Sequence, residues 1–173
     1  STGMITLGSA AGASVLANGM TLSVGGLGFN AGILQIQRFN QVGSTPQSLA
    51  LGNTAQLYFL TANTFGGNMV ASAGRMFLGG TTFNGTGRFA KTGAGGDGSA
   101  GNCVFNGFTE FFNGNTGHFA ISYYGPDQFN ADVQVNSTST GLLSFGQSGG
   151  SATLANGRTI TVGGSGFNTG ALA

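Results

Sequence analysis

The chain consists of short stretches in which apolar and polar side chains alternate, a pattern typical of β-strands that are buried on one face. Such stretches recur along the whole sequence, at residues 4–7, 20–24, 33–37, 56–60, 118–123, 131–135 and 159–162. Asn-Gly and Gly-Gly steps separate them and supply the positive φ angles that sharp corners need. No segment of useful length has helical periodicity. The pattern therefore predicts an all-β protein with many short strands and tight corners.

A Phe-Asn pair, often followed by Gly, marks a short internal period. The pairs are Phe29-Asn30, Phe39-Asn40, Phe83-Asn84, Phe105-Asn106, Phe112-Asn113, Phe129-Asn130 and Phe167-Asn168, and Phe65 before Gly66 is a degenerate copy. The steps from Phe65 to Phe129 are 18, 22 and 24 residues, the scale of a solenoid repeat. We therefore expect a right-handed parallel β-solenoid (β-helix) with about 20 residues per coil.

The same residues predict how the coils are held together. Coils of a solenoid stack about 4.8 Å apart, so each side chain lies over its counterpart in the next coil. The Phe rings of the marks are expected to form an inward ladder on one wall. The Asn amides are expected to pair at a corner with the coils above and below. These Phe and Asn residues are the predicted structural site.

A longer repeat encloses the short one, because residues 1–35 return as residues 139–173 with about half of the positions identical and no gap. Gly19 and Gly157, like every other matched pair, are 138 positions apart. Residues 1–138 are thus expected to be one full tandem module of roughly seven coils. Residues 139–173 would begin the next module without a linker. We expect the chain to be a window on a longer array, whether covalent or built from subunits that meet end to end.

Composition supports an ordered solenoid. Gly accounts for 35 of the 173 residues, charged residues for only 5%, and the net charge is +1. A hydrophobic fraction of 40% with so little charge argues against disorder. Stacked coils explain the scarcity of charge, since like charges about 4.8 Å apart repel. The alternative, one β-sandwich domain per module, would need charged solvent faces, and the Phe-Asn period argues against it.

Several kinds of partner and cofactor are not expected. The five basic residues are scattered and form no nucleic-acid footprint, and no apolar run is long enough for membrane insertion. Cys103 is the only cysteine, and we expect it to be a small buried residue. The glycine-rich stretch 93–98 has a single Asp, too few ligands for calcium, and no Lys-Ser or Lys-Thr for phosphate. No metal ion and no cofactor are therefore expected.

Candidate catalytic residues are few. The acids available for a glycosidase pair are Asp97, Glu110, Asp127 and Asp132. No motif sets two of them at a defined spacing. His118 lies in a strand pattern with no Ser or Cys nucleophile motif beside it. Tyr123 and Tyr124, close to Asp127, are candidates for a sugar-binding corner, although a structural turn is the simpler interpretation. We expect no catalytic residues and no enzyme.

Residues 16–34 and 154–172 share the pattern LANGxTxxVGGxGFNxGxL, and the Phe-Asn-Gly marks lie between them. In these motifs the chain resembles the tandem β-strand-repeat modules of giant secreted, adhesin-like surface proteins of Bacteroidetes-type bacteria. The resemblance implies secretion to the cell surface, β-solenoid stalks or filaments, and roles in adhesion, gliding or matrix. Its motifs are structural, so it assigns no functional residues.

We therefore expect a structural repeat module of an extracellular bacterial filament or adhesin stalk, which gives length and rigidity by coil stacking. Its expected partners are identical or similar modules stacked end to end, and surface glycans are a further candidate. Two alternatives stay open. One is a glycan- or surface-binding adhesin module, and the other is a polysaccharide-cleaving β-helix enzyme.

Overall fold

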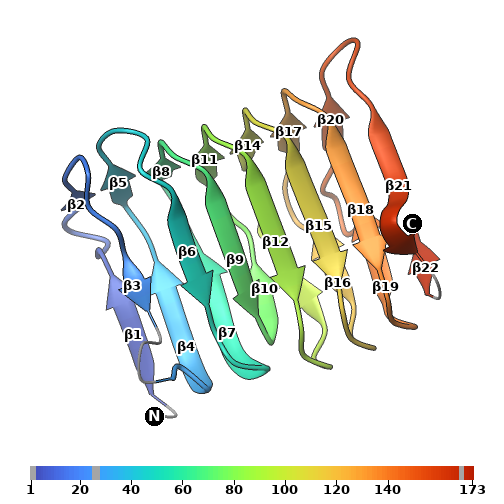
Figure 1. The fold of residues 1–173 in the computed structure, drawn as a ribbon, viewed down its shortest axis with the longest axis horizontal. Helices are drawn as coiled ribbons and strands as arrows, with labels where there is room; N and C mark the ends of the chain where they lie inside the picture. Colours follow the sequence, from blue (N-terminus) through green and yellow to red (C-terminus); the bar gives the residue numbers. More distant parts are fainter. Residues whose placement is uncertain (1–2, 25–27, 168–169) are drawn as a thin grey trace.

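The structure is a computed structural model that describes residues 3–24, 28–167 and 170–173. These residues form 22 short β-strands and no helix. The strands wind into a parallel β-solenoid with three walls (Figure 1). The chain descends the front wall and rises along the back wall while it advances from the N- to the C-terminus, so the winding is right-handed (Figure 1). The predicted fold class is confirmed.

Every strand pairs in parallel with a strand of the same wall in a neighbouring coil, and the pairing is continuous along each wall except between β10 and β13. Wall 1 consists of β1 (Met4–Leu7), β4 (Ala31–Ile36), β7 (Thr54–Phe59), β10 (Arg75–Phe77), β13 (Asp97–Gly98), β16 (Phe119–Ile121), β19 (Leu142–Phe145) and β22 (Ala171–Leu172). Wall 2 consists of β2 (Ser14–Leu16), β5 (Phe39–Gln41), β8 (Asn63–Phe65), β11 (Thr81–Phe83), β14 (Val104–Phe105), β17 (Asp127–Phe129) and β20 (Ala152–Leu154). Wall 3 consists of β3 (Ser23–Val24), β6 (Gln47–Ala50), β9 (Met69–Ala73), β12 (Gly87–Lys91), β15 (Thr109–Asn113), β18 (Val133–Ser137) and β21 (Ile160–Phe167).

The strand register shows how many coils one sequence repeat contains. In wall 2, six steps of pairing lead from Val15 to Thr153. In wall 3, six steps lead from Ser23 to Thr161. Both pairs are 138 positions apart, so the module is six coils of about 23 residues. At about 4.8 Å per coil, one module is about 29 Å long.

The predicted seven coils of about 20 residues were therefore wrong in number. The reason is the spacing of 18 residues between Phe65 and Phe83, the shortest step of wall 2, on which the predicted coil length partly rested. The Phe112-Asn113 pair lies in β15 of wall 3 and marks no coil of its own. Corner loops differ in length from coil to coil, and a short step taken as typical gives too many coils.

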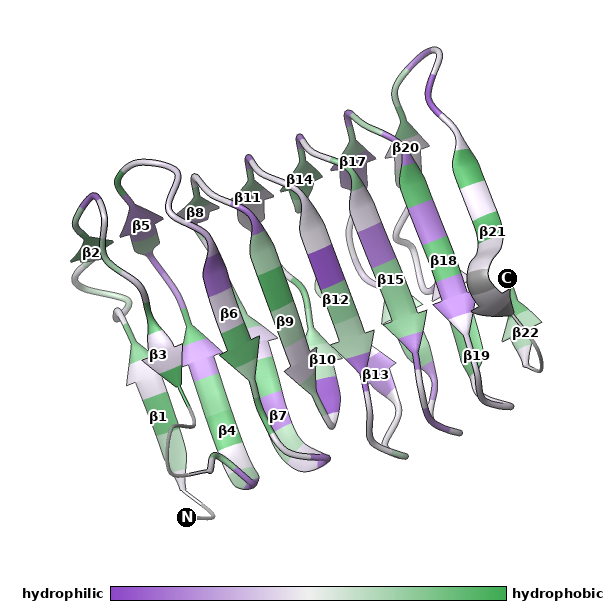
Figure 2. Cartoon of the chain, in the orientation of Figure 1, coloured by the Kyte–Doolittle hydropathy of each residue, from purple (hydrophilic) through white to green (hydrophobic). Residues whose placement is uncertain are grey.

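Inward side chains fill the space between the walls with apolar groups. In wall 3, β9 and β12 both alternate between buried and more accessible residues. The hydropathy colours of Figure 2 follow this alternation only in part, because Val70 in β9 is apolar and exposed and Lys91 in β12 is charged and buried. Because one coil has only a few inward residues, its apolar side chains are covered mainly by the coils on either side. The register between neighbouring coils therefore decides the stability of the whole stack.

The corner between walls 1 and 2 turns through a residue with positive φ in each coil. Each of the first seven wall-1 strands is followed by at least one such residue: Gly8, Arg38, Ala62, Gly80, Gly101 with Asn102, Ser122, and Gly146 with Ser148 and Gly149. Glycine adopts this backbone at no steric cost, whereas other L-residues are strained there by about 1–2 kcal/mol. The corner geometry is thus maintained even where the sequence provides no glycine.

Replacing Ala62 with Gly should stabilise the fold by about 0.5–1 kcal/mol. Ala62 has a φ of 57° and is exposed, so the substitution relieves backbone strain without removing a buried contact. Urea unfolding followed by circular dichroism measures the change. Ala50→Gly at the outward end of β6 is the control, and it should lower stability by about 0.5–1 kcal/mol. Equal losses in both variants would contradict the strain at Ala62.

Candidate functional site

An aromatic column runs along wall 2 at the last position of four successive strands. Phe65, Phe83, Phe105 and Phe129 are in register. Their ring centroids are 5.7, 5.3 and 4.8 Å apart, and neighbouring rings lie within 12° of parallel. Each ring is at most 1% exposed. Stacked aromatic pairs contribute about 0.5–1.5 kcal/mol each beyond the burial of their area, so this column is a main source of cohesion between coils.

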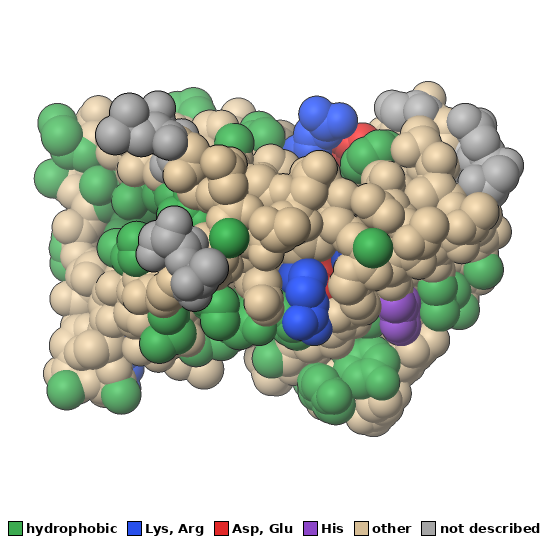
Figure 3. Space-filling model, turned by 90° about the horizontal axis from the view of Figure 1, so that it is seen from below, with side chains coloured by type: hydrophobic (Ala, Val, Ile, Leu, Met, Phe, Trp, Pro, Cys, Tyr) green, Lys and Arg blue, Asp and Glu red, His purple; other side chains and the backbone are tan. Residues whose placement is uncertain are grey.

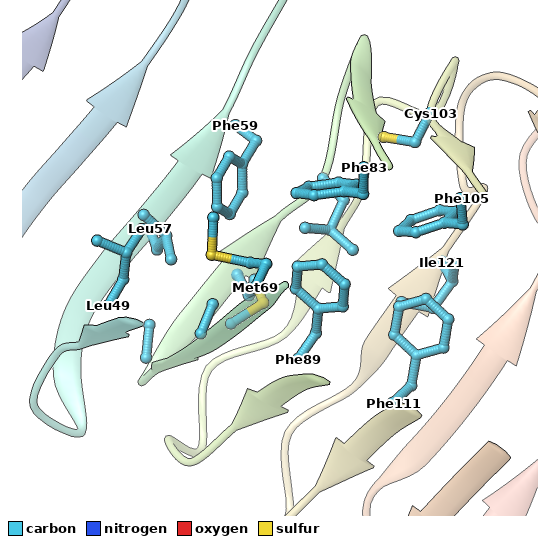
Figure 4. Packing of buried hydrophobic residues seen from close by; sticks show 14 of the residues in the cluster. Leu49, Leu57, Phe59, Met69, Phe83, Phe89, Cys103, Phe105, Phe111 and Ile121 are labelled. Carbon is cyan, nitrogen blue, oxygen red and sulfur yellow. The ribbon is translucent and has the colours of Figure 1, made fainter. Parts of the chain in front are cut away.

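A second set of rings interlocks with this column. Phe89 and Phe111 of wall 3 are in register, with centroids 5.8 Å apart. They meet the wall-2 rings edge to face, Phe89 with Phe83 at 4.9 Å and Phe111 with Phe105 at 5.7 Å (Figure 4). The Phe-Asn pattern does not identify Phe89 or Phe111, because neither residue is followed by Asn. The signal that identifies them is the alternation within their strands.

Two of the predicted pairs near the N-terminus lie elsewhere. Phe39 is two positions earlier in its strand than the column residues, yet its ring contacts Phe65 at 5.4 Å and so caps the column. Asn40 is exposed on the outer face of wall 2. Phe29 lies at the corner before β4, where its partly buried ring packs against the core, and Asn30 beside it is exposed. The strict ladder therefore begins at Phe65.

Two other pairs also lie outside the column. Phe112 lies on the outer face of wall 3 and is only half-buried, while Asn113 points inward and is fully buried. The predicted inward Phe and corner Asn are thus reversed for this pair, because β15 ends at the Asn of the pair, whereas the wall-2 strands of the column end at the Phe. The backbone of Phe167 belongs to β21. Its side chain and Asn168 lie outside the described residues.

Three of the predicted asparagines form a column at the corner that follows wall 2. The amide of Asn106 donates to Oδ1 of Asn84 at 2.8 Å, and the amide of Asn130 donates to Oδ1 of Asn106 at 2.7 Å. These side chains lie at the surface. Each amide group therefore satisfies the next one along the axis, as in other stacked strands.

A buried polar column marks the end of wall 3. Lys91, Asn113 and Ser137 are in register, point inward and are 0% exposed. Each donates a hydrogen bond to a carbonyl oxygen of its own corner loop, Lys91 to that of Gly93. Burial lowers the pKa of Lys91, and the nearby Asp97 carboxylate partly opposes this shift. Side-chain donors thus satisfy corner carbonyls that the strands leave unpaired.

Wall 1 is interrupted between β10 and β13, where side chains replace the backbone ladder. Asp97 Oδ2 accepts the N–H of Met76 at 2.9 Å, and Ser99 Oγ accepts the N–H of Leu78 at 3.2 Å. Asp97 Oδ1 also pairs with Nε of Arg75 at 3.2 Å. The glycine-rich stretch before Asp97 is thus the corner loop that leads to this interruption of wall 1, which we call the seam. The Asp97 carboxylate bonds residues of the preceding coil and so holds two coils together.

The seam makes stability depend on pH. Burial raises the pKa of Asp97 from 3.8 to about 6, against the opposing effects of the Met76 N–H, Lys91 and Arg75. The folded chain therefore binds a proton more readily than the unfolded chain between about pH 4 and pH 6, and its stability falls as the pH rises through this window. We expect Asp97 to contribute a loss of about 2–3 kcal/mol between pH 4 and pH 7.

Thermal unfolding at a series of pH values measures this dependence. Burial also raises the pKa of Asp127, which adds to the effect, and lowers the pKa of His118, which opposes it. The difference between the wild-type chain and Asp97→Asn isolates the contribution of Asp97. The variant should lose most of the pH slope between pH 4 and pH 6. An unchanged slope would contradict the assignment to Asp97.

A second buried carboxylate holds the corner near Cys103. Asp127 Oδ1 accepts the N–H of Cys103 at 2.7 Å, and Oδ2 accepts the hydroxyl of Ser122 at 2.7 Å. Asp127 is 1% exposed, so it does not join Tyr123 or Tyr124 in a sugar-binding corner. The Cys103 thiol is free and buried, and burial together with the Asp127 charge raises its pKa. A thiol of this kind is a poor nucleophile at neutral pH.

The remaining acids lie on the outside. Glu110 on the outer face of wall 3 pairs with its register neighbour Arg88 at 2.9 Å. Asp132 accepts the N–H of Thr159 at the next coil, at 2.9 Å. On the face shown in Figure 3, acidic groups lie beside the blue Arg and Lys groups, and most of the surface is uncharged. Opposite charges in neighbouring coils avoid the repulsion that like charges would have.

His118 and Ser144 make a contact of a type that occurs in catalytic sites. His118 Nε2 lies 2.6 Å from Ser144 Oγ of the next coil. Ser144 is 0% exposed, so a substrate has no access to its hydroxyl. The ring of Tyr123 packs 6.2 Å from His118 and against Tyr124, which is 65% exposed. The arrangement stabilises a corner and does not present a nucleophile.

Two of the hollows on the surface of the described residues bear on function. One of about 490 Å³ lies outside wall 2 and is lined by Asn102, Cys103, Val104, Pro126, Asp127, Gln128 and Thr153. The other, of about 260 Å³, opens at the N-terminal end of the core and is lined by Ile5, Leu7, Leu22, Ser23, Val24, Phe29 and Leu34. The second is the interior of the solenoid at its uncovered end.

Comparisons with known proteins found no similarity. No family model, no curated protein and no solved structure matches the chain. Within the described ranges, no cluster of three or more His, Cys, Asp or Glu side chains could hold a metal ion. A search of the same residues for a helix able to cross a membrane found none. The columns and the two ends of the solenoid are therefore the features on which a function can be argued.

Proposed function

We propose that the chain is a structural repeat module of an extracellular bacterial filament or adhesin stalk, giving length and rigidity by coil stacking. The observation that carries the proposal is that the 138-residue repeat equals six whole coils in walls 2 and 3. A module of whole coils presents the same walls again at its end, so the next module continues the ladders without a linker. Nearest-neighbour stacking then extends the stack in proportion to the number of modules.

Further features support a structural role. Asp97 and Asp127 hold backbone N–H groups, and Glu110 pairs with Arg88, so these carboxylates serve the stack. The resemblance to secreted surface repeats of Bacteroidetes-type bacteria supports the cell surface as the location. We expect no catalytic activity, no cofactor and no nucleic-acid partner. The proposed partners are similar modules on the same axis.

Electron microscopy of the native particle tests this function. We expect rods or fibres with an axial repeat of about 29 Å, equal to six coils. Antibody labelling of intact cells should find the particle on the outside. Compact particles without an axial repeat would refute the filament, and labelling confined to permeabilised cells would refute the location.

The exposed Tyr124 favours a second candidate function, binding of surface glycans. Its ring is 65% exposed and is held edge-on by Tyr123 at 4.5 Å. Exposed tyrosine rings of this kind are suited to binding a glycan, because the ring face is apolar and the hydroxyl group can form hydrogen bonds at the surface. Binding on a glycan array that is lost in Tyr124→Ala would support an adhesin. If no glycan on the array bound the chain, the glycan-binding function would be rejected and only the structural role would remain.

A further inference from the structure

The N-terminal end of the solenoid has the character of an interface. The first strand of each wall has a neighbour on one side only. Met4, Ile5 and Met20 are 61%, 50% and 55% exposed, and the hollow of about 260 Å³ opens into the apolar interior. Residues 1–37 contain no charged side chain. Exposed strand edges in soluble proteins usually carry charges or prolines that prevent pairing, and this edge lacks both.

The same coil occurs a second time in the chain with its neighbour in place. Residues 139–167 are the counterpart of residues 1–29 and lie on the preceding coil through all three walls. Leu143, the counterpart of Ile5, pairs with Phe119 of that coil and is 0% exposed, against 50% for Ile5. The contrast between these equivalent positions shows what the first coil lacks, namely the coil beneath it.

We propose that the N-terminal end is a docking surface for a second copy of the module, whose residues 110–138 lie against the first coil as they lie against residues 139–167 within this chain. This inference rests on the proposed function and specifies its contact. The apolar pairs follow from the observed register after subtraction of 138: Phe119 with Ile5, Ile121 with Leu7, Phe129 with Leu16, Val133 with Leu22 and Val135 with Val24.

Polar contacts of the covered coil also have counterparts at the open end. His118 contacts the hydroxyl of Ser144, and the position equivalent to Ser144 is Thr6, which also has a hydroxyl. The Asp132 carboxylate, which accepts the N–H of Thr159, would accept that of Thr21 in the same way. The open end therefore offers apolar and hydrogen-bonding groups at the positions where the covered coil has them.

Geometry favours a copy of the module over another occupant. An unrelated apolar segment could cover one wall, whereas a copy pairs with β1, β2 and β3 together. The contact joins two different surfaces, so it is heterologous and does not close, and repeated contacts build an open filament. Each added module extends the axis by about 29 Å.

A two-module chain, in which residues 1–138 are joined directly to the N-terminus of the whole chain 1–173, tests the docking surface. Amide hydrogen exchange is measured at residues 4–7 of the second, C-terminal copy. We expect exchange there to be slower by about tenfold or more than in the single chain, because local opening now requires separation of two coils. Residues 171–172 at the far end serve as the internal control and should exchange alike. Equal exchange at residues 4–7 in both chains would overturn the proposal.

Substitutions at the edge add a second readout. Ile5→Asp should change the unfolding constant of the single chain little, and should raise it by about tenfold or more when it is made in the second copy. Val15→Asp is the matched control, since Val15 is 65% exposed on the outer face of wall 2 and should be tolerated in both chains. Equal effects of Ile5→Asp in both chains would contradict the contact.

These results separate the inference from the proposed function. A protected junction in the two-module chain, with a native particle that is not a fibre, would retain the docking surface and reject the filament. A native fibre with an unprotected junction would retain the filament and reject this contact.

Discussion

Replacing Phe105 with Ala should lower the free energy of unfolding by about 3–5 kcal/mol. The ring is 1% exposed and lies between Phe83 and Phe129, with centroids 5.3 and 4.8 Å away. It also meets Phe89 and Phe111 edge to face. Truncation removes these contacts and leaves a cavity between coils that the β-ladders prevent from collapsing. Urea unfolding followed by far-ultraviolet circular dichroism measures the loss.

Phe112→Ala is the matched control for this prediction. Phe112 begins the same Phe-Asn-Gly triplet, but its side chain lies on the outer face of wall 3 and is only half-buried. The expected loss is about 1 kcal/mol, in proportion to its smaller buried area. If the two substitutions destabilised the chain equally, the wall-2 column would not be the main source of cohesion between coils.

The contrast between these two phenylalanines shows what the sequence could predict. Alternation, glycine corners and the 138-residue repeat indicate a solenoid, because each of them follows from the geometry of single strands and turns. The Phe-Asn motif could not tell a pair whose Phe ends a wall-2 strand from a pair whose Asn ends a wall-3 strand. That distinction depends on where each corner loop ends, and loop length is determined by contacts with neighbouring coils. The coil number was wrong for this reason.

The buried polar groups could not be predicted for a related reason. Lys91 and Asn113 can be identified as register partners only once the coil lengths are known, and nothing in their local sequences indicates complete burial. Asp97 follows a run of glycines that gives no sign of burial, yet its carboxylate bridges two coils of wall 1. Such groups are needed where corners interrupt the ladders, and the interruptions are a property of the stack.

Replacing Gly101 with Ala should destabilise the chain by about 2–5 kcal/mol. Gly101 has a φ of +76°, and a Cβ placed there would overlap the carbonyl group of Gly125 in the next coil. On the other side, its backbone bonds Leu78 and Gly80 of the preceding coil at 3.1 and 2.8 Å. The residue is thus clamped between two coils. The added methyl group would have to separate two coils that pairing holds about 4.8 Å apart.

Gly19→Ala separates the two causes of this effect. Gly19 has a φ of +80°, but nothing lies within 4 Å of a Cβ placed there. Its substitution should cost only the backbone strain, about 1–2 kcal/mol. The excess loss in Gly101→Ala then measures the steric limit that close stacking sets at the corner between walls 1 and 2. If thermal unfolding showed equal losses in both variants, the coils could separate locally at little cost, and the stack would not be stiff enough for a stalk.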